Sequence, residues 1–77
     1  MLMIRFELRQ ALLDYQARTG IKMSYEQLSE YTDVSIETLK SIATRKNYNA
    51  TFKVISIIAM SLGINPIEYL NWEIQNE

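Results

Sequence analysis

The stretch SYEQLSEYTDVSIETLKSIA, residues 24–43, decides the fold, because it holds two short helical patterns separated by a tight turn. Ser24 with Gln27 three residues later is a capping box, which begins a helix. Ser35 can cap a second helix, and Asp33 tolerates the backbone geometry of the turn between the two. Two short helices joined by so tight a turn are typical of a helix-turn-helix.

Apolar residues with helical spacing predict the core. Within and after the quoted stretch, the residues expected to be buried are Leu28, Val34, Leu39, Ile42, Ile55, Ile58 and Leu62. Tyr31 is expected on the inner face of the helix that follows Ser24. Phe52 is expected on the inner face of a later helix, and Ile67 on that of the last one.

Local start and stop signals predict three further helices outside this stretch. A first helix over residues 8–18 ends at Gly20, because glycine suits the left-handed cap. Thr51 can cap a helix that runs through Leu62 and stops at Gly63. Asn65-Pro66 is expected to begin a fifth helix, since proline fits the first helical turn.

Both ends of the chain alternate between apolar and polar residues, which is the pattern of short strands. The apolar members are Leu2, Ile4, Phe6 and Leu8 at the start and Leu70, Trp72 and Ile74 at the end. The strands could pair within one chain or between chains, and residues 2–7 could instead extend the first helix. We therefore predict one all-α, five-helix domain over residues 1–77, with a core of 8–70 and terminal segments 1–7 and 71–77 that can form strands.

Composition argues against catalytic and metal-binding classes of protein. The chain has 77 residues, 48% of them hydrophobic, and it contains neither cysteine nor histidine. Disulfides, thiolate metal sites and the commonest general base are therefore missing, so we expect no enzyme, no metal and no cofactor. No apolar run approaches the ~18 residues of a membrane span, and charges interrupt the opening MLMIRFELRQ, so a cytoplasmic protein is expected.

Charge is unevenly distributed, although the net charge is only −1. Residues 36–53 carry Lys40, Arg45, Lys46 and Lys53 against Glu37 alone. All the charged residues among 54–77 are acidic. A local basic patch is the footprint of phosphate binding, although it is equally typical of an ordinary solvated face.

The pattern of these residues resembles the Cro/C1-type (lambda-repressor-like) helix-turn-helix DNA-binding family. The matching positions, in register over roughly residues 8–70, are Ser24, Leu28-Ser29, Asp33-Val34-Ser35, Thr38-Leu39 and Leu62-Gly63-Ile64. Asp33 departs from the usual turn glycine, and Ala43-Thr44-Arg45 departs from a common Glu-Arg/Asn-Gly run. The terminal segments are similar to those of a small bacterial and phage subgroup with short terminal strands.

The resemblance implies a sequence-specific DNA-binding transcriptional regulator, either a small phage or bacterial-type repressor or an antitoxin-like autoregulator. The helix at about residues 35–45 would lie in the major groove of double-stranded DNA. By position, the residues facing base edges would be Ile36, Glu37, Lys40 and Ser41. Those contacting phosphates would be Ser24, Tyr25, Thr44, Arg45, Lys46 and Tyr48.

Alternatives to this DNA-binding interpretation stay open. Arg45 and Lys46 could complement the dipole at the end of their helix instead of binding phosphates. Ile36 and Glu37 stand where many members of the family have polar base-reading residues, and Glu37 repels phosphate. The alternative function is a protein-binding adaptor that keeps the fold and has weak or no DNA affinity.

The apolar residues at the two ends predict a homodimer. The expected interface is formed by Leu2, Ile4, Phe6, Trp72 and Ile74. These side chains exceed what a five-helix core needs, and exposed apolar surface of this kind marks interfaces. Alternatively, Trp72 simply caps the core of a monomer.

Overall fold

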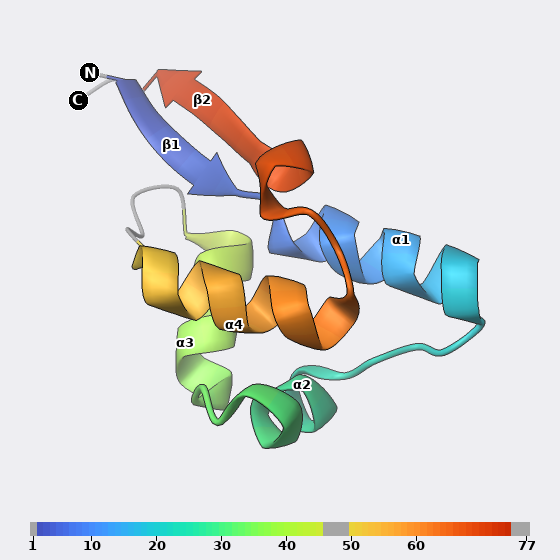
Figure 1. The fold of residues 1–77 in the computed structure, drawn as a ribbon. Helices are drawn as coiled ribbons and strands as arrows, with labels where there is room; N and C mark the ends of the chain where they lie inside the picture. Colours follow the sequence, from blue (N-terminus) through green and yellow to red (C-terminus); the bar gives the residue numbers. More distant parts are fainter. Residues whose placement is uncertain (1, 46–49, 75–77) are drawn as a thin grey trace.

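The computed structural model describes residues 2–45 and 50–74, which form a helical domain closed by a two-stranded antiparallel sheet (Figure 1). In chain order the elements are β1 (Leu2–Phe6), α1 (Leu8–Thr19), α2 (Tyr25–Thr32), α3 (Ile36–Thr44), α4 (Phe52–Leu62), the 3₁₀ helix η1 (Pro66–Tyr69) and β2 (Leu70–Ile74). The predicted, mainly helical fold is confirmed, but these residues form four α-helices and not five. None of the helices in the described ranges is both long enough and apolar enough to cross a membrane.

Helices begin and end at the residues whose side chains or backbones suit those positions. Thr51 Oγ1 accepts a hydrogen bond from the amide of Val54 at 3.2 Å and so caps α4. Gly20 and Gly63 end α1 and α4 with φ of 77° and 66°, in the left-handed region that glycine adopts without a Cβ penalty. Local chemistry therefore sets most of the element boundaries.

The expectation of a fifth α-helix is wrong, because the residues from Pro66 to Tyr69 form only the short 3₁₀ turn of η1. Asn65 Oδ1 accepts from the amide of Ile67 at 3.1 Å, and Pro66 stands at the first position, so the predicted start is real. The turn then ends because Leu70 is already extended and pairs with Phe6 of β1. Strand pairing thus replaces the hydrogen bonds that a continued helix would have made, and Ile67 stays exposed.

The two terminal segments pair within the chain, so residues 2–6 form a strand and do not extend the first helix. β1 and β2 run antiparallel, in a register from Leu2 opposite Ile74 to Phe6 opposite Leu70. The amide of Glu7 extends the contact by donating to the carbonyl of Tyr69 at 2.8 Å. Figure 1 shows the sheet at one side of the helices.

The core contains the seven residues that the sequence analysis expects to be buried. Leu28, Leu39, Ile58 and Leu62 are fully buried, and Val34, Ile42 and Ile55 are buried as well. Three other predictions of inward-facing residues are wrong, since Tyr31, Phe52 and Ile67 are exposed. In α2 it is Thr32 that shares the buried face with Leu28, and Phe52 lies on the first turn of α4, beyond the packed part of that helix.

Side chains of α1 fix the end of α4 and η1 to the domain. The Arg18 guanidinium donates to the carbonyls of Leu62 at 2.6 Å and Gly63 at 3.3 Å. The Tyr69 hydroxyl donates to Asp14 Oδ2 at 2.6 Å. This hydrogen bond lowers the pKa of Asp14 and raises the pKa of Tyr69, because it stabilises the carboxylate and the protonated phenol together.

Candidate nucleic-acid interface

The α2–α3 unit is built around a turn of three residues, Asp33-Val34-Ser35. Asp33 has φ of 60° and ψ of 21°, and its amide donates to the carbonyl of Ser29 at 2.8 Å. This left-handed residue ends α2, and Ser35 begins α3 two residues later. Val34 between them is buried, so the turn is pinned to the core by its middle residue.

Thr32 stabilises this turn through two buried hydrogen bonds. Its hydroxyl donates to the carbonyl of Leu28 at 2.7 Å and accepts from the amide of Val34 at 3.2 Å. Thr32 is only 6% exposed, so water does not replace either bond. Sequence reasoning missed this residue, although the same pattern, a threonine just before a left-handed residue, also occurs at Thr19-Gly20.

Side-chain caps fix the starts of both helices. Ser24 Oγ accepts from the amide of Gln27 at 3.1 Å, and Gln27 Oε1 accepts from the amide of Ser24 at 3.0 Å, so the predicted capping box is confirmed. Ser35 Oγ accepts from the amide of Thr38 at 3.1 Å. First-turn amides have no partner inside a helix, so those of Tyr25 and Glu26 can bind an external acceptor such as a phosphate. Ser24 is exposed and Tyr25 is half-buried.

The outer face of α3 presents a mixed set of charges. Glu37, Lys40 and Thr44 are exposed at helical spacing, Arg45 follows them and is also exposed, and Ile36 is half-buried. We call Glu37, Lys40, Thr44 and Arg45 the α3 face. Two basic groups and one acidic group thus stand where a groove or a partner could meet them.

Ser41 does not belong to the α3 face, so the expectation that it points outward with Glu37 is wrong. It is 8% exposed, and the next two residues, Ile42 and Ala43, are also buried. Three consecutive buried residues cover a little more than half of the helix circumference, so Ser41 lies on the side that packs against the domain, while Lys40 and Thr44 are exposed on the other side. Ser41 is therefore out of reach of a base edge unless the surrounding structure moves.

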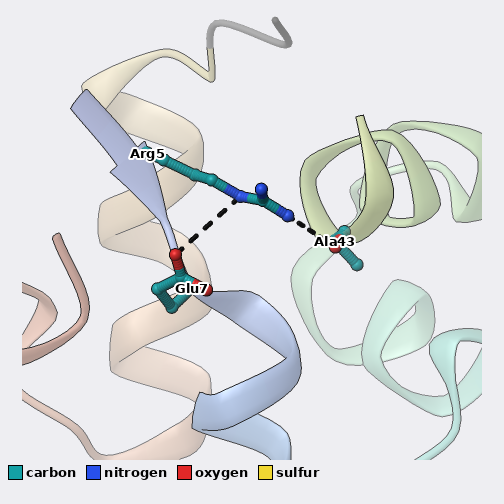
Figure 2. Close-up of polar contacts among 3 residues, drawn as sticks. All are labelled: Arg5, Glu7 and Ala43. Carbon is teal, nitrogen blue, oxygen red and sulfur yellow. Dashed lines mark hydrogen bonds and ion pairs between the residues drawn. The ribbon is translucent and has the colours of Figure 1, made fainter. Parts of the chain in front are cut away.

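The C-terminal end of α3 is held by an arginine from β1 (Figure 2). Arg5 Nη2 donates to the carbonyl of Ala43 at 3.2 Å, and Arg5 Nε lies 3.9 Å from Glu7 Oε1. The guanidinium places positive charge at the negative end of the helix dipole. Sequence reasoning had offered Arg45 and Lys46 for this role and had missed Arg5, because β1 and α3 are far apart in the chain.

Two of the predicted phosphate-contacting residues, Lys46 and Tyr48, lie outside the described residues. Thr44 is exposed, and its hydroxyl donates to the carbonyl of Lys40 at 2.7 Å, which fixes its rotamer at the end of the α3 face. In the described parts of the chain, no group of three or more acidic side chains is placed to hold a metal ion.

The expected dimer residues are divided between the core and the surface. Phe6 is buried against the domain's own core, so its assignment to an interface is wrong. Ile4 is exposed and Trp72 is 69% exposed, so Trp72 does not cap the core. Leu2 and Ile74 end the sheet as a backbone pair. Ile4 and Trp72 border an apolar groove of about 580 Å³ between the sheet and the start of α4.

Comparison with known proteins identifies no relative of this chain. No protein-family model matches the chain, and neither a curated protein nor a solved structure matches it. The function is therefore inferred from the α2–α3 unit and the surfaces around it.

Proposed function

We propose that this chain binds double-stranded DNA in the cytoplasm, with the α3 face in the major groove, and acts as a small repressor or an antitoxin-like autoregulator. The observation that carries the proposal is the capped α2–turn–α3 unit, which exposes Glu37 and Lys40 on its second helix and Arg45 directly after it. An α-helix fits the major groove, and a helix fixed at both ends presents its side chains there in one orientation.

In this proposal the exposed residues divide into two kinds of contact. Glu37 can accept from a cytosine amino group, and Ile36 can touch a thymine methyl group. Lys40 and Arg45, with the first-turn amides of α2, would bind phosphates, which position the protein without reading sequence. Occupying an operator would then block transcription without any chemical step.

The DNA-binding form is proposed to be a homodimer, because one short helix reads only a few base pairs. Two-fold dimers read two half-sites about 34–36 Å apart and so gain specificity from both copies. The exposed apolar side chains Ile4 and Trp72, which the domain does not bury itself, favour this view.

A protein-binding adaptor is the second candidate. The observation that favours it is the exposed Glu37 carboxylate on the first turn of α3, in a chain of net charge −1. A carboxylate there is stabilised by the helix dipole without any DNA, and it would repel a phosphate backbone.

Salt-dependent binding to a random pool of oligonucleotides tests the proposal. Fluorescence anisotropy should show affinity that falls with salt at a slope of about −0.9 per neutralised phosphate. Arg45→Ala or Lys46→Ala should weaken binding to all sequences alike and reduce the slope by about one, while the charge-conserving Arg45→Lys should keep it. Unchanged affinity at low salt in both alanine variants would refute the phosphate contacts, and no salt-dependent binding at all would favour the adaptor.

A further inference from the structure

A second groove is lined by α1 and by the segment that leads into α2, away from the groove beside the sheet. Its volume of about 350 Å³ is at the lower end of the ~300–1,000 Å³ that small-molecule sites occupy. From α1 it is lined by residues at helical spacing, which are Arg9, Leu12, Leu13 and Gln16. From the other side it is lined by residues 22–25. We call it the α1–α2 groove.

The α1–α2 groove presents apolar side chains to water. Met23 is buried, Leu12 and Tyr25 are half-buried, and Leu13 is 60% exposed. Apolar side chains that converge on a concave surface favour an apolar ligand, because contact removes both surfaces from water.

Positive charge lines the same groove. Arg9 and Lys22 are both exposed, and neither forms a hydrogen bond or an ion pair with any residue that the structure describes. None of the described residues that line the groove is acidic. Ser24 and Tyr25, the N-cap and first residue of α2, add the positive end of a helix dipole. The groove therefore attracts an anion, and its two cations are not used to hold the fold.

We propose that the α1–α2 groove binds a small amphipathic anion. The apolar body of the ligand lies against Leu12, Leu13 and Met23, and its acidic head group lies at Arg9 and Lys22. An inorganic phosphate would use only the cations and would leave the apolar side chains in water, so the two features together select a ligand that has both parts. Medium-chain carboxylates belong to this class, and octanoate is the probe chosen below. The site does not depend on the proposed function.

A ligand in this groove competes with DNA, a consequence that does rest on the proposed function. There the first-turn amides of α2 bind a phosphate, and Tyr25, which carries one of these amides, also lines the groove. The head group and the phosphate are both anions, so they exclude each other from this position. A saturating ligand therefore weakens DNA binding at the α2 contact.

Titration of the ¹⁵N-labelled parent with octanoate tests the site by NMR without DNA. The shifts should centre on amides of the groove, including Leu13 and Met23, while the indole N–H of Trp72, in the groove beside the sheet, stays unchanged. The dissociation constant should be submillimolar, on the order of 0.3 mM. Hexanoate, two methylenes shorter, should bind about tenfold more weakly, and the uncharged octan-1-ol at least about fivefold more weakly. Shifts centred on Trp72, or equal affinities for octanoate and hexanoate, would overturn the proposal.

Variants at exposed positions separate the head-group contact from the apolar one. Lys22→Gln and Arg9→Gln should each weaken octanoate binding about fivefold, and the charge-conserving Lys22→Arg should keep it. Lys40→Gln, on α3 outside the groove, is the matched charge control. Leu13→Ser should also weaken binding about fivefold, whereas Ile67→Ser, at an exposed apolar residue outside the groove, should not. Circular dichroism checks that all variants fold. Parent-like affinity in both Lys22→Gln and Leu13→Ser would refute the site.

Fluorescence anisotropy with labelled DNA tests the competition separately. At about 3 mM octanoate, tenfold above its expected dissociation constant, the apparent dissociation constant for DNA should rise about tenfold, and 3 mM acetate is the ionic control. The rise should be at most about threefold in Leu13→Ser, which binds octanoate less tightly. DNA affinity that is unchanged in the parent at this concentration would refute the competition. A parent that binds no DNA would refute the proposed function and the competition together, while the NMR titration still decides the site.

Discussion

Replacing Thr32 by valine should destabilise the domain, because this hydroxyl makes two buried hydrogen bonds in the turn between α2 and α3. Valine has nearly the same shape and a similar helix propensity, so packing and backbone are preserved. The change removes the bond to the Leu28 carbonyl and leaves the amide of Val34 without its acceptor. A buried donor left unsatisfied costs about 1–3 kcal/mol, so we expect a loss of about 2 kcal/mol in the free energy of unfolding.

Thr19→Val is the matched control for this experiment. The Thr19 hydroxyl donates to the carbonyl of Tyr15 at 2.7 Å and accepts from the amide of Ile21 at 3.1 Å, which is the same pair of bonds as at Thr32. Thr19 is exposed, however, so water can replace both partners, and the expected loss is below about 0.5 kcal/mol. The two variants therefore differ in burial and hardly in chemistry.

Urea and thermal unfolding followed by circular dichroism measure both losses. For a domain of this size, a loss of 2 kcal/mol lowers the melting temperature by roughly 10 °C. All variants must be compared at one protein concentration, because dimerisation would raise their apparent stability. Equal losses for Thr32→Val and Thr19→Val would refute the reasoning, since burial would then not govern the value of these bonds.

Tyr69→Phe should lower stability near pH 7, and the difference from the parent should shrink at acid pH, once the Asp14 carboxyl is protonated in the folded state. The Tyr69 hydroxyl lowers the folded-state pKa of Asp14, so its contribution is present above the unfolded pKa of that carboxyl and is lost as the pH falls through the folded value. Urea unfolding near pH 7 and at acid pH checks this, and a loss independent of pH would contradict it. Asp33→Gly should raise the free energy of unfolding by about 0.5 kcal/mol, because glycine adopts φ of 60° without strain; lower stability in the same assay would mean that the aspartate side chain contributes more than its backbone costs. Glu37→Gln should change the preferred base at one position of each half-site by roughly 1–3 kcal/mol in an oligonucleotide selection, and an unchanged preference would exclude Glu37 as a base reader.

Features set by neighbouring residues could be predicted from the sequence. The caps at Ser24, Ser35 and Thr51 depend on hydrogen bonds that reach only three residues along the chain. The helix ends at Gly20 and Gly63 depend on the conformation of a single residue. Helical spacing likewise predicted most of the core, because the inner face of a helix repeats regularly, but it placed Tyr31, Phe52 and Ile67 inward although they are exposed.

Features set by distant parts of the chain could not be predicted in this way. The turn that begins at Pro66 does not continue as a helix beyond Tyr69, because β1, from the other end of the chain, pairs with the residues that follow. Ser41 has the spacing of an outward residue on α3, but it lies at the edge of the side of the helix that packs against the domain and is buried there. Arg5 reaches the carbonyl of Ala43 across 38 positions, and no local pattern connects the two. The candidate site was therefore predicted best at the start of α3 and least well at its end.

The pairing of β1 with β2 also sets the order in which the chain can fold during its synthesis. Among the described elements β1 is synthesised first and β2 last, so β1 has no strand to pair with until all four α-helices have been translated. Until then Phe6 lacks its cross-strand neighbour Leu70, and the open strand edge can pair with other chains. A ribosome that stalls before residue 70 would expose this strand, and the arrested chain would be a substrate for chaperones and proteases even with its helices formed.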